Sequence, residues 1–492
     1  MSAGNRLSKG FRLTFLGRIV HISANAALMV LLTRYLLQPA EYGLLFLGLS
    51  VVGVARLFSD LGLAKSAARY VSEFKENDPA QIPHVLLAAL KYRLALVALV
   101  GGVLAVANQP IARFIGEPEL APLLLVGAGY LGVHSLSVFN SLLFQGFNRV
   151  EWSALVQIVN NANRVVFVVV FVFGLGLGAV GAMLGYLAGA GLAMLVGTAI
   201  LYRKFYSRHE KADSPEEGLS RRVLEYSVPL TVTKGAGVLN NKIDTILIGV
   251  LLNPAAVGFY TIAKQISSSV LAPAGSLGFT ISPELGEQKA NEQLDRAAEL
   301  YQQAVEYTLL LYIPGAVGLV LVAEPTVRVV FGEEYLSAVP VVQVFGAYVV
   351  LRAINKITTK TLDFLGRARI RAIAKGVTAG ANFVLNLLLI PRFGVVGAGF
   401  ATVATYGAYT AINVSVMQSE LPLALSDLGR SVALIGGTAI GMAAVVFAST
   451  PLISNAISLA GVVLLGVAVW AGLSIASGLV NPRTVVSFLA SD

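Results

Sequence analysis

Long apolar runs recur along almost the whole chain, from Arg12 to Val480, and they limit the fold more than any other feature. Each run has about 20 residues, enough for a helix to cross a hydrocarbon layer of roughly 30 Å. Hydrophobic residues make up 56% of the 492 positions and charged residues only 13%, a balance unlike that of a soluble domain. Because the runs are continuous rather than alternating, they predict membrane-spanning helices and not a β-barrel.

We predict an all-α polytopic membrane protein with about fourteen transmembrane helices. The first run is longer than the apolar core of a signal peptide and thirteen similar runs follow, so we interpret it as a transmembrane helix. The predicted spans are 12–36, 42–65, 84–107, 119–142, 152–173, 178–201, 223–251, 257–281, 302–323, 338–361, 371–390, 396–419, 430–449 and 456–479.

The loop charges indicate which way the helices cross the membrane. Of 36 Lys and Arg residues, 20 lie in loops on the side of the N-terminus, and only Arg34, Arg113, Arg328 and Arg392 lie in loops on the other side. Since cytoplasmic loops carry the excess of Lys and Arg, we expect a multi-pass cell-membrane protein with both termini in the cytoplasm. The net charge of +9 then reflects orientation and contact with anionic lipid, and nucleic-acid binding is not expected.

The sequence repeats at a nearly constant offset. LLQPAEYG from Leu36 recurs as LLNPAAVG from Leu251, 215 residues later, and GAVGA from Gly178 recurs as GVVGA from Gly394, 216 residues later. Each copy holds six spans, so both copies enter the membrane in the same direction, and a substrate path is expected between them. We predict an N-terminal lobe at 1–205, a cytoplasmic linker at 206–222, a C-terminal lobe at 223–420, and two extra spans with the C-terminus at 421–492.

Cations inside the spans predict an anionic substrate. A charge at membrane depth costs about 2.5–3.5 kcal/mol, so it is expected to face a watery cavity or a partner. Arg352, Lys356 and Lys360 recur every four residues and form one basic stripe, unless the two lysines snorkel and Arg352 pairs with an acid. The predicted cationic cavity consists of Arg18, Arg56, Lys234, Lys264, Arg352, Lys356 and Lys360. We expect Lys91, Arg93 and Lys375, near the cytoplasmic ends of their spans, to snorkel instead.

Acidic and neutral polar residues complete the predicted site. Asp60 and Asp244 are the clearest buried acids and are candidates to bind Na⁺ or H⁺ as a coupling ion, although Asp244 has the alternative of an ion pair with a neighbouring Lys. The predicted polar lining of the cavity is Asn25, His134, Ser141, Asn241 and Thr245, with helix packing as the alternative for the span of His134. No catalytic residue, metal site or other cofactor is expected, because the chain has no Cys, four scattered His and no Walker loop.

Three segments carry a family resemblance: TRYLLQPAEYGLLFLG from Thr33, FSDLGLAKSAARYVSE from Phe58, and NNKIDTILIGVLLNPAAVGFYTIAKQI from Asn240. With them, the chain resembles the Wzx-type polysaccharide-transport flippases of the MOP exporter superfamily. The resemblance implies alternating access through a cationic central cavity. The substrate would be an isoprenoid (undecaprenyl or dolichyl) diphosphate-linked oligosaccharide, moved from the inner to the outer leaflet for surface polysaccharide, such as O-antigen, or glycoprotein assembly. The expected partners are this substrate, membrane lipids and polysaccharide assembly proteins, with the transporter itself acting as a monomer.

Three alternatives remain open at this point. A multidrug or organic-cation antiporter of the same superfamily would need an acidic cavity, whereas the intramembrane charges here are mostly basic. A lipid II flippase would differ only in the glycan that it carries. A membrane-embedded glycosyltransferase or polymerase would need catalytic carboxylates and usually a large outer loop, and neither is visible, so we expect a transporter and not an enzyme.

Overall fold

A computed structural model describes residue 17 and residues 19–271 and 293–480, with the side chains at 228–234, 236, 240, 425 and 427 left out of the description. Every regular element in these ranges is a helix, which confirms the predicted all-α class. The chain divides into two compact units, Met1–Gly258 and Phe259–Asp492, and each is described by itself.

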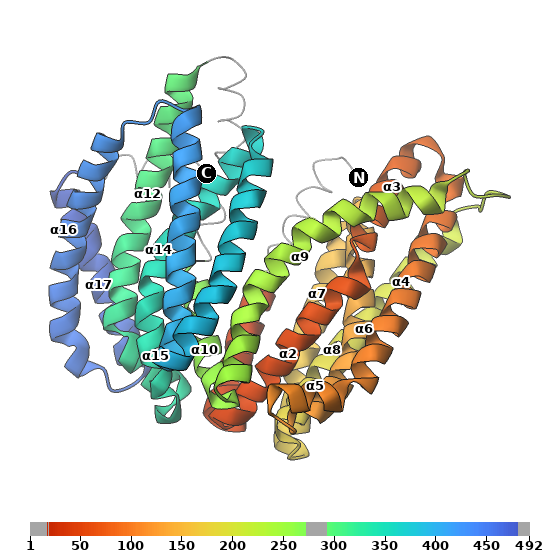
Figure 1. The fold of residues 1–492 in the computed structure, drawn as a ribbon, viewed down its shortest axis with the longest axis horizontal. Helices are drawn as coiled ribbons and strands as arrows, with labels where there is room; N and C mark the ends of the chain where they lie inside the picture. The colour runs from red at the N-terminus through yellow and green to blue at the C-terminus, as the bar shows by residue number, and fades with distance from the viewer. Residues whose placement is uncertain (1–16, 18, 272–292, 481–492) are drawn as a thin grey trace. The chain divides into compact units, whose positions relative to one another are not determined.

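The first unit opens with a helix over Ile19–Leu36, whose last turn, Leu32–Leu36, is π-helical. Short segments follow some of the main helices: 3₁₀ turns at Pro79–Gln81 and Tyr206–Arg208, and a π-helical turn at Val170–Gly174 that extends α7. The main helices are α2 (Pro39–Asp60), α3 (Leu63–Asn77), α4 (Ile82–Val106), α5 (Asn108–Ile115), α6 (Leu120–Gly146), α7 (Val150–Val169), α8 (Gly178–Lys204) and α9 (Leu219–Leu251) (Figure 1). The next helix, α10 (Pro254–Val270), begins at the end of this unit.

The second unit continues with membrane-length helices joined by short helical turns. The turns are α13 (Ala323–Thr326), a π-helical turn at Val327–Phe331, and 3₁₀ turns at Glu333–Ala338 and Thr450–Leu452. The long helices are α12 (Leu294–Leu321), α14 (Val339–Phe364), α15 (Ala368–Glu420), α16 (Leu425–Ser449) and α17 (Ala456–Ala476).

The 53 residues of α15 form two membrane crossings rather than one helix. A straight helix of that length would extend about 80 Å, far beyond the thickness of a bilayer. Gly394 adopts φ 60° and ψ −143°, outside the helical region, three residues after Pro391. The predicted spans 371–390 and 396–419 lie on either side of this break.

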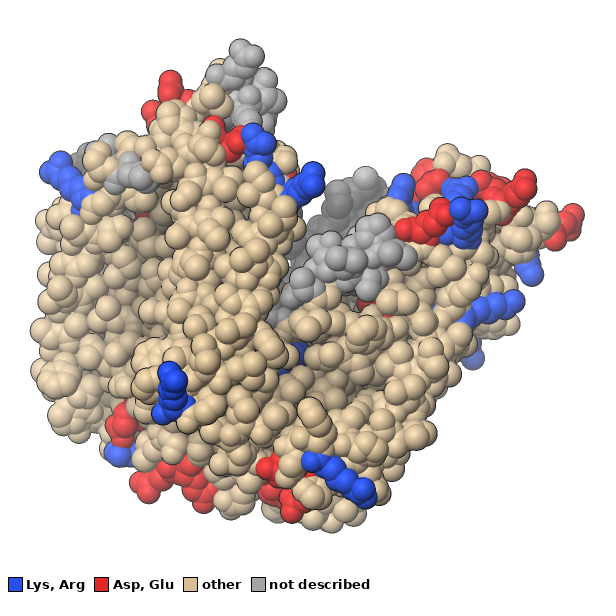
Figure 2. All heavy atoms as spheres, in the orientation of Figure 1, with Lys and Arg blue, Asp and Glu red and all other residues tan. Residues whose placement is uncertain are grey.

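Eleven helices in the described ranges are long and apolar enough to span a membrane. The break in α15 adds one crossing. The charged α9 and the 17-residue α10 correspond to the seventh and eighth predicted spans, and the latter span extends to 281, outside the described residues. On the face shown in Figure 2, the charged side chains of each unit lie mostly toward the helix ends, and the band between is almost free of them.

The predicted second span, 42–65, is wrong at its C-terminal end. α2 stops at Asp60, and Leu61 and Gly62 adopt left-handed conformations with φ of 36° and 72°. A separate helix, α3, then buries one apolar face that includes Ala67 and Val71. The apolar residues that follow Gly62 look like a continuation of the span, because composition does not report a break in the helix that a glycine permits.

The repeat extends to the backbone conformation. Gly116 and Gly332, 216 residues apart, have φ of 88° and 108°, and Gly178 and Gly394, also 216 apart, have φ of 51° and 60°. Gly116 and Gly332 lie shortly before α6 and α14, whereas Gly178 begins α8 and Gly394 divides α15. These matching positions support a duplication. The first compact unit ends at Gly258, whereas the second copy of the repeat was predicted to begin at 223. The difference arises because α9 packs against α2 and α3 in the first unit. The lobe limits drawn from the sequence stay a prediction.

The repeated Pro-x-x-x-Gly motif forms a close helix crossing within the first unit. A Cβ on Gly43 in α2 would overlap the carbonyl oxygen of Pro254, and a Cβ on Gly258 would lie 2.8 Å from the carbonyl oxygen of Pro39. The two contacts are reciprocal, because each glycine approaches the proline of the other copy of the motif. Glycine at these two positions therefore lets α2 and the start of α10 touch backbone to backbone.

Candidate functional site

A cavity of about 470 Å³ lies in the first unit between α2, α6 and α9. Its charged lining residues are Arg56 and Asp60 from α2 and Lys242 from α9. The volume is within the range of small-molecule binding sites, and the two cations exceed the single carboxylate. This cavity, here called the cationic cavity, contains two of the residues that the sequence indicated, Arg56 and Asp60, and adds Lys242.

Helical spacing and a glycine create the space. Gly53, Arg56 and Asp60 follow one another at intervals of three and four residues, so they share one face of α2. A Cβ on Gly53 would lie only 3.3 Å from the Cε atom of Lys242, which means that the lysine stem lies over this glycine. On α9, a Cβ on Gly237 would meet no atom within 4 Å, so Gly237 borders open space.

Arg93 is buried and paired, so the expectation that it snorkels is wrong. Its side chain is 1% exposed and donates from Nη1 to Oδ1 of Asp60 at 2.7 Å. Its other terminal nitrogen, Nη2, donates to the carbonyl oxygen and the hydroxyl of Ser135 at 2.6 and 2.9 Å. Three helices thus meet at one guanidinium, because the carboxylate on α2 and the Ser135 acceptors on α6 lie at the depth of Arg93 on α4. The number of residues between two helices does not show whether their side chains lie at the same depth.

We expect Gly53→Leu to reduce transport about fivefold or more while the protein still folds. The leucine side chain would enter the cationic cavity and displace Lys242, at a cost typical of overpacking, about 1–3 kcal/mol. Gly102→Leu on α4 is the matched control, since a Cβ there meets nothing within 4 Å. Thermal unfolding and a transport assay on both variants check the prediction, and wild-type transport by Gly53→Leu would contradict the assignment of the cavity.

A polar network links the first helix to α7. The Nη2 atom of Arg164 donates to Oδ1 of Asn25 at 2.7 Å, and the guanidinium lies 4.9 Å from the ring centre of Tyr186. One turn earlier on each helix, Nδ1 of His21 lies 3.3 Å from Oδ1 of Asn161. The predicted lining residue Asn25 therefore orients Arg164. Arg164 was not among the predicted site residues, although its charge inside a span was a signal for it.

His134 and Ser141, the two predicted lining residues of α6, occupy different surroundings. The His134 ring stacks on Tyr130 with 5.1 Å between ring centres, and His134 is not among the residues that line the cationic cavity. Ser141 is buried two turns further along α6 and is not among the residues that line the cavity.

In the second unit, the predicted basic stripe lies along one face of α14. The Arg352 guanidinium lies 5.5 Å from the ring centre of Tyr348, and Nζ of Lys356 donates to the carbonyl oxygen of Leu271 at 2.9 Å. Lys360 is exposed. Within the described part of the chain, Arg352 forms no ion pair, so the alternative in which it pairs with an acid gains no support. On α10, Nζ of Lys264 lies 5.5 Å from the ring centre of Tyr260.

The other predicted residues lie on α9 or outside the description. Asp244 and Thr245 are 3% and 5% exposed, whereas Asn241 is exposed and donates its amide to the carbonyl oxygen of Gly237 at 2.9 Å. Arg18 and the side chain of Lys234 lie outside the described residues. Lys242 follows Lys234 by eight residues, about 80° around the helix, so the sequence held a signal for it. The binding and coupling roles of all these residues stay predictions.

Many membrane-length helices, an internal repeat and cations inside the helical bundle define a polytopic helical membrane protein. The chain belongs to the polysaccharide biosynthesis protein family, whose family model matches residues 7–279. A second family model, MatE, matches residues 229–388.

Relatives and solved structures agree with this class. The probable low-salt glycan biosynthesis flippase Agl15 of Haloferax volcanii is 23% identical over 383 residues, which cover 78% of each chain. An inward closed structure of the lipid II flippase MurJ aligns with a TM-score of 0.74 at 15% identity, over 94% of this chain and 97% of that one. An inward-facing multidrug resistance MATE transporter of the MOP superfamily aligns with a TM-score of 0.68 at 16% identity, over 84% and 99%. At such low identity, the two structures show a shared fold.

Proposed function

We propose that this protein is a flippase that moves an isoprenoid diphosphate-linked oligosaccharide from the cytoplasmic to the outer leaflet by alternating access. The product would feed the assembly of surface polysaccharide or glycoprotein. The glycan flippase Agl15 is a relative along most of its length, and the family name points to the same process.

The cationic cavity is the observation that carries this proposal. Arg56 and Lys242 line it, and Asp60, the one carboxylate among the described lining residues, already accepts a hydrogen bond from the buried Arg93. Guanidinium and ammonium groups replace the lost hydration of a phosphate with charge-assisted hydrogen bonds, so this lining suits a diphosphate. The cations of the second unit, Lys264 and Arg352, are the further residues that we assign to the diphosphate.

The membrane potential supplies a driving force for this direction. Moving one negative charge outward across an inside-negative membrane gains about 2.3 kcal/mol per 100 mV, and a diphosphate gains roughly twice as much. We propose that the potential drives transport, with Na⁺ or H⁺ at Asp60 or Asp244 as the alternative source of energy.

Export of organic cations is the second candidate, because the MatE model matches residues 229–388. An exporter of organic cations would need carboxylates that can bind the positive charge of the substrate. In the first unit, the cavity carboxylate Asp60 lies 2.7 Å from Arg93, and Arg56 and Lys242 would repel a cation. The charge of the cavity therefore favours the flippase.

Reconstitution in liposomes tests the proposal. We expect the purified protein to move lipid diphosphate-linked oligosaccharide across the bilayer, faster with an imposed potential that is negative on the substrate side. Ethidium, a permanent organic cation, is the comparison substrate in the same liposomes. Uptake of ethidium without movement of the glycolipid would refute the flippase and favour the cation exporter, and a series of glycans would separate lipid II from other oligosaccharides.

A further inference from the structure

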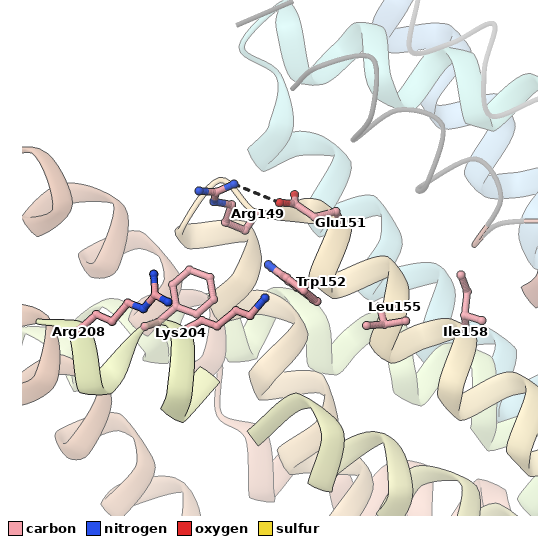
Figure 3. Close-up of a pocket in the computed structure, with 8 residues that line it drawn as sticks. Arg149, Glu151, Trp152, Leu155, Ile158, Lys204 and Arg208 are labelled. Carbon is pink, nitrogen blue, oxygen red and sulfur yellow. Dashed lines mark hydrogen bonds and ion pairs between the residues drawn. The ribbon is translucent and has the colours of Figure 1, made fainter. Parts of the chain in front are cut away.

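A second cavity, of about 460 Å³, lies at one end of the first unit where the start of α7 meets the end of α8. Arg149, Lys204 and Arg208 surround its polar end, and Glu151 is the one acid in its lining. Figure 3 shows Arg149 just before α7 and Glu151 in its first turn, with Lys204 at the end of α8 and Arg208 in the 3₁₀ turn that follows. Arg149 pairs with Glu151 at 3.4 Å, so the lining keeps a net excess of two positive charges.

The lining changes from charged to apolar along α7. After Arg149 and Glu151 come Trp152, Leu155 and Ile158, which follow one another down the helix in Figure 3. From Trp152 to Ile158 the helix advances about 9 Å. Leu155 is 36% exposed, and only 22% of the apolar window of this span is buried in the protein, so Leu155 is accessible on a helix that the protein covers little. The lining of the cavity thus passes from charged groups to apolar side chains of a membrane-length helix.

Trp152 and Lys204 connect the two ends of the cavity. The ammonium of Lys204 lies 4.0 Å from the centre of the Trp152 ring, which holds the lysine over the opening. Tryptophan prefers the boundary between headgroups and acyl chains, and Lys or Arg residues beside it favour an anion there. Phe205, the next residue after Lys204, also lines the cavity, and its buried ring packs against Phe147.

We propose that this cavity binds the headgroup of an anionic phospholipid, with its phosphate among Arg149, Lys204 and Arg208 and an acyl chain along Leu155 and Ile158. A water-soluble phosphate would match the cations but would leave the apolar part of the cavity without a partner. A zwitterionic lipid would match the apolar part but gain little from the excess positive charge. An anionic lipid satisfies both parts at once. The proposed topology places the cavity in the cytoplasmic leaflet, and the binding itself does not depend on the flippase function.

The test measures lipid binding to the purified full-length protein in detergent, by thermal shift and native mass spectrometry. We expect phosphatidylglycerol to stabilise the wild type and phosphatidylcholine to have a much smaller effect. Each of Lys204→Ala and Arg208→Ala should weaken the apparent affinity for phosphatidylglycerol about fivefold, since each cation near the surface adds a comparable contribution. Trp152→Leu should weaken it as well, and Lys204→Arg should retain it.

Arg203→Ala is the matched control, because Arg203 is exposed beside Lys204 but does not line the cavity. We expect this variant to bind like the wild type. Lys204 and Arg208 are exposed, so their truncation leaves the packing intact, and the unliganded melting temperature verifies this. Undiminished binding by Lys204→Ala together with Arg208→Ala would overturn the site. An equal shift with glycerophosphoglycerol, the same headgroup without acyl chains, would overturn the assignment to a lipid.

Discussion

Arg56→Gln is expected to slow transport of the lipid diphosphate-linked oligosaccharide about 10- to 150-fold at limiting substrate. Glutamine keeps the size and polarity of the side chain in the cationic cavity but removes its charge. A hydrogen bond to a charged group contributes about 1.5–3 kcal/mol, which corresponds to this loss of affinity. Lys242→Gln should have an effect of the same order, and Arg56→Lys should be milder, because it keeps the charge and loses only the forked geometry.

Lys91→Gln is the control for these variants. Lys91 is exposed on α4 and does not line the cationic cavity, so its loss changes the net charge by the same amount without touching the proposed site. We expect transport by this variant to be close to that of the wild type. The flipping assay in liposomes, with matched amounts of reconstituted protein, makes the comparison. Wild-type rates for both Arg56→Gln and Lys242→Gln would show that the diphosphate binds elsewhere.

Arg93→Ala is expected to lower the free energy of unfolding by about 3–5 kcal/mol. It removes a fully buried guanidinium that holds Asp60 and two acceptors of Ser135, so a carboxylate is left without this cation inside the membrane-spanning bundle. The double variant Asp60→Leu with Arg93→Met should recover much of the loss, because an apolar pair replaces a buried ion pair at little net cost. Unfolding of the purified protein in an SDS titration measures all three forms.

The same double variant separates a structural role of Asp60 from ion coupling. If Asp60 only neutralises Arg93, the stable double variant should transport with the same dependence on Na⁺, pH and potential as the wild type. If Asp60 binds the coupling ion, that dependence should disappear while stability is retained. Lys91→Ala, two residues before Arg93 and exposed, is the control for loss of a cation from α4. A small effect of Arg93→Ala on stability would contradict the importance of the pair.

The class of fold followed from patterns that are local in the sequence. Apolar runs of membrane length need no tertiary contact to be recognised, since the bilayer fixes the length of a spanning helix. The repeat was also visible, and its glycines at Gly178 and Gly394 both have a positive φ, of 51° and 60°. In contrast, the end of α2 was placed too late, because a helix break at Leu61 and Gly62 leaves no mark on hydropathy.

The candidate site was predictable in kind but not in its partners. The charge of Arg56 inside a span was visible in the sequence, and so was that of Lys242. The pairing of Arg93 with Asp60 was not, since the two residues lie 33 positions apart on helices whose relative depth and rotation depend on packing. From its own helix alone, Arg93 was expected to snorkel. It is instead buried, because Asp60 on α2 pairs with it.

By itself, the sequence determined that this protein spans a membrane many times, repeats its helices and carries a surplus of cations within them. These properties follow from the composition of each segment and from the regular spacing of the repeats, which are visible without any tertiary contact. Only the tertiary structure decided which of these charges come together: Arg93 is held by Asp60, and Asp60 lines the cationic cavity with Arg56 and Lys242. The physical reason is that the cost of a buried charge depends on the atoms within a few ångströms of it, and packing alone brings those atoms together.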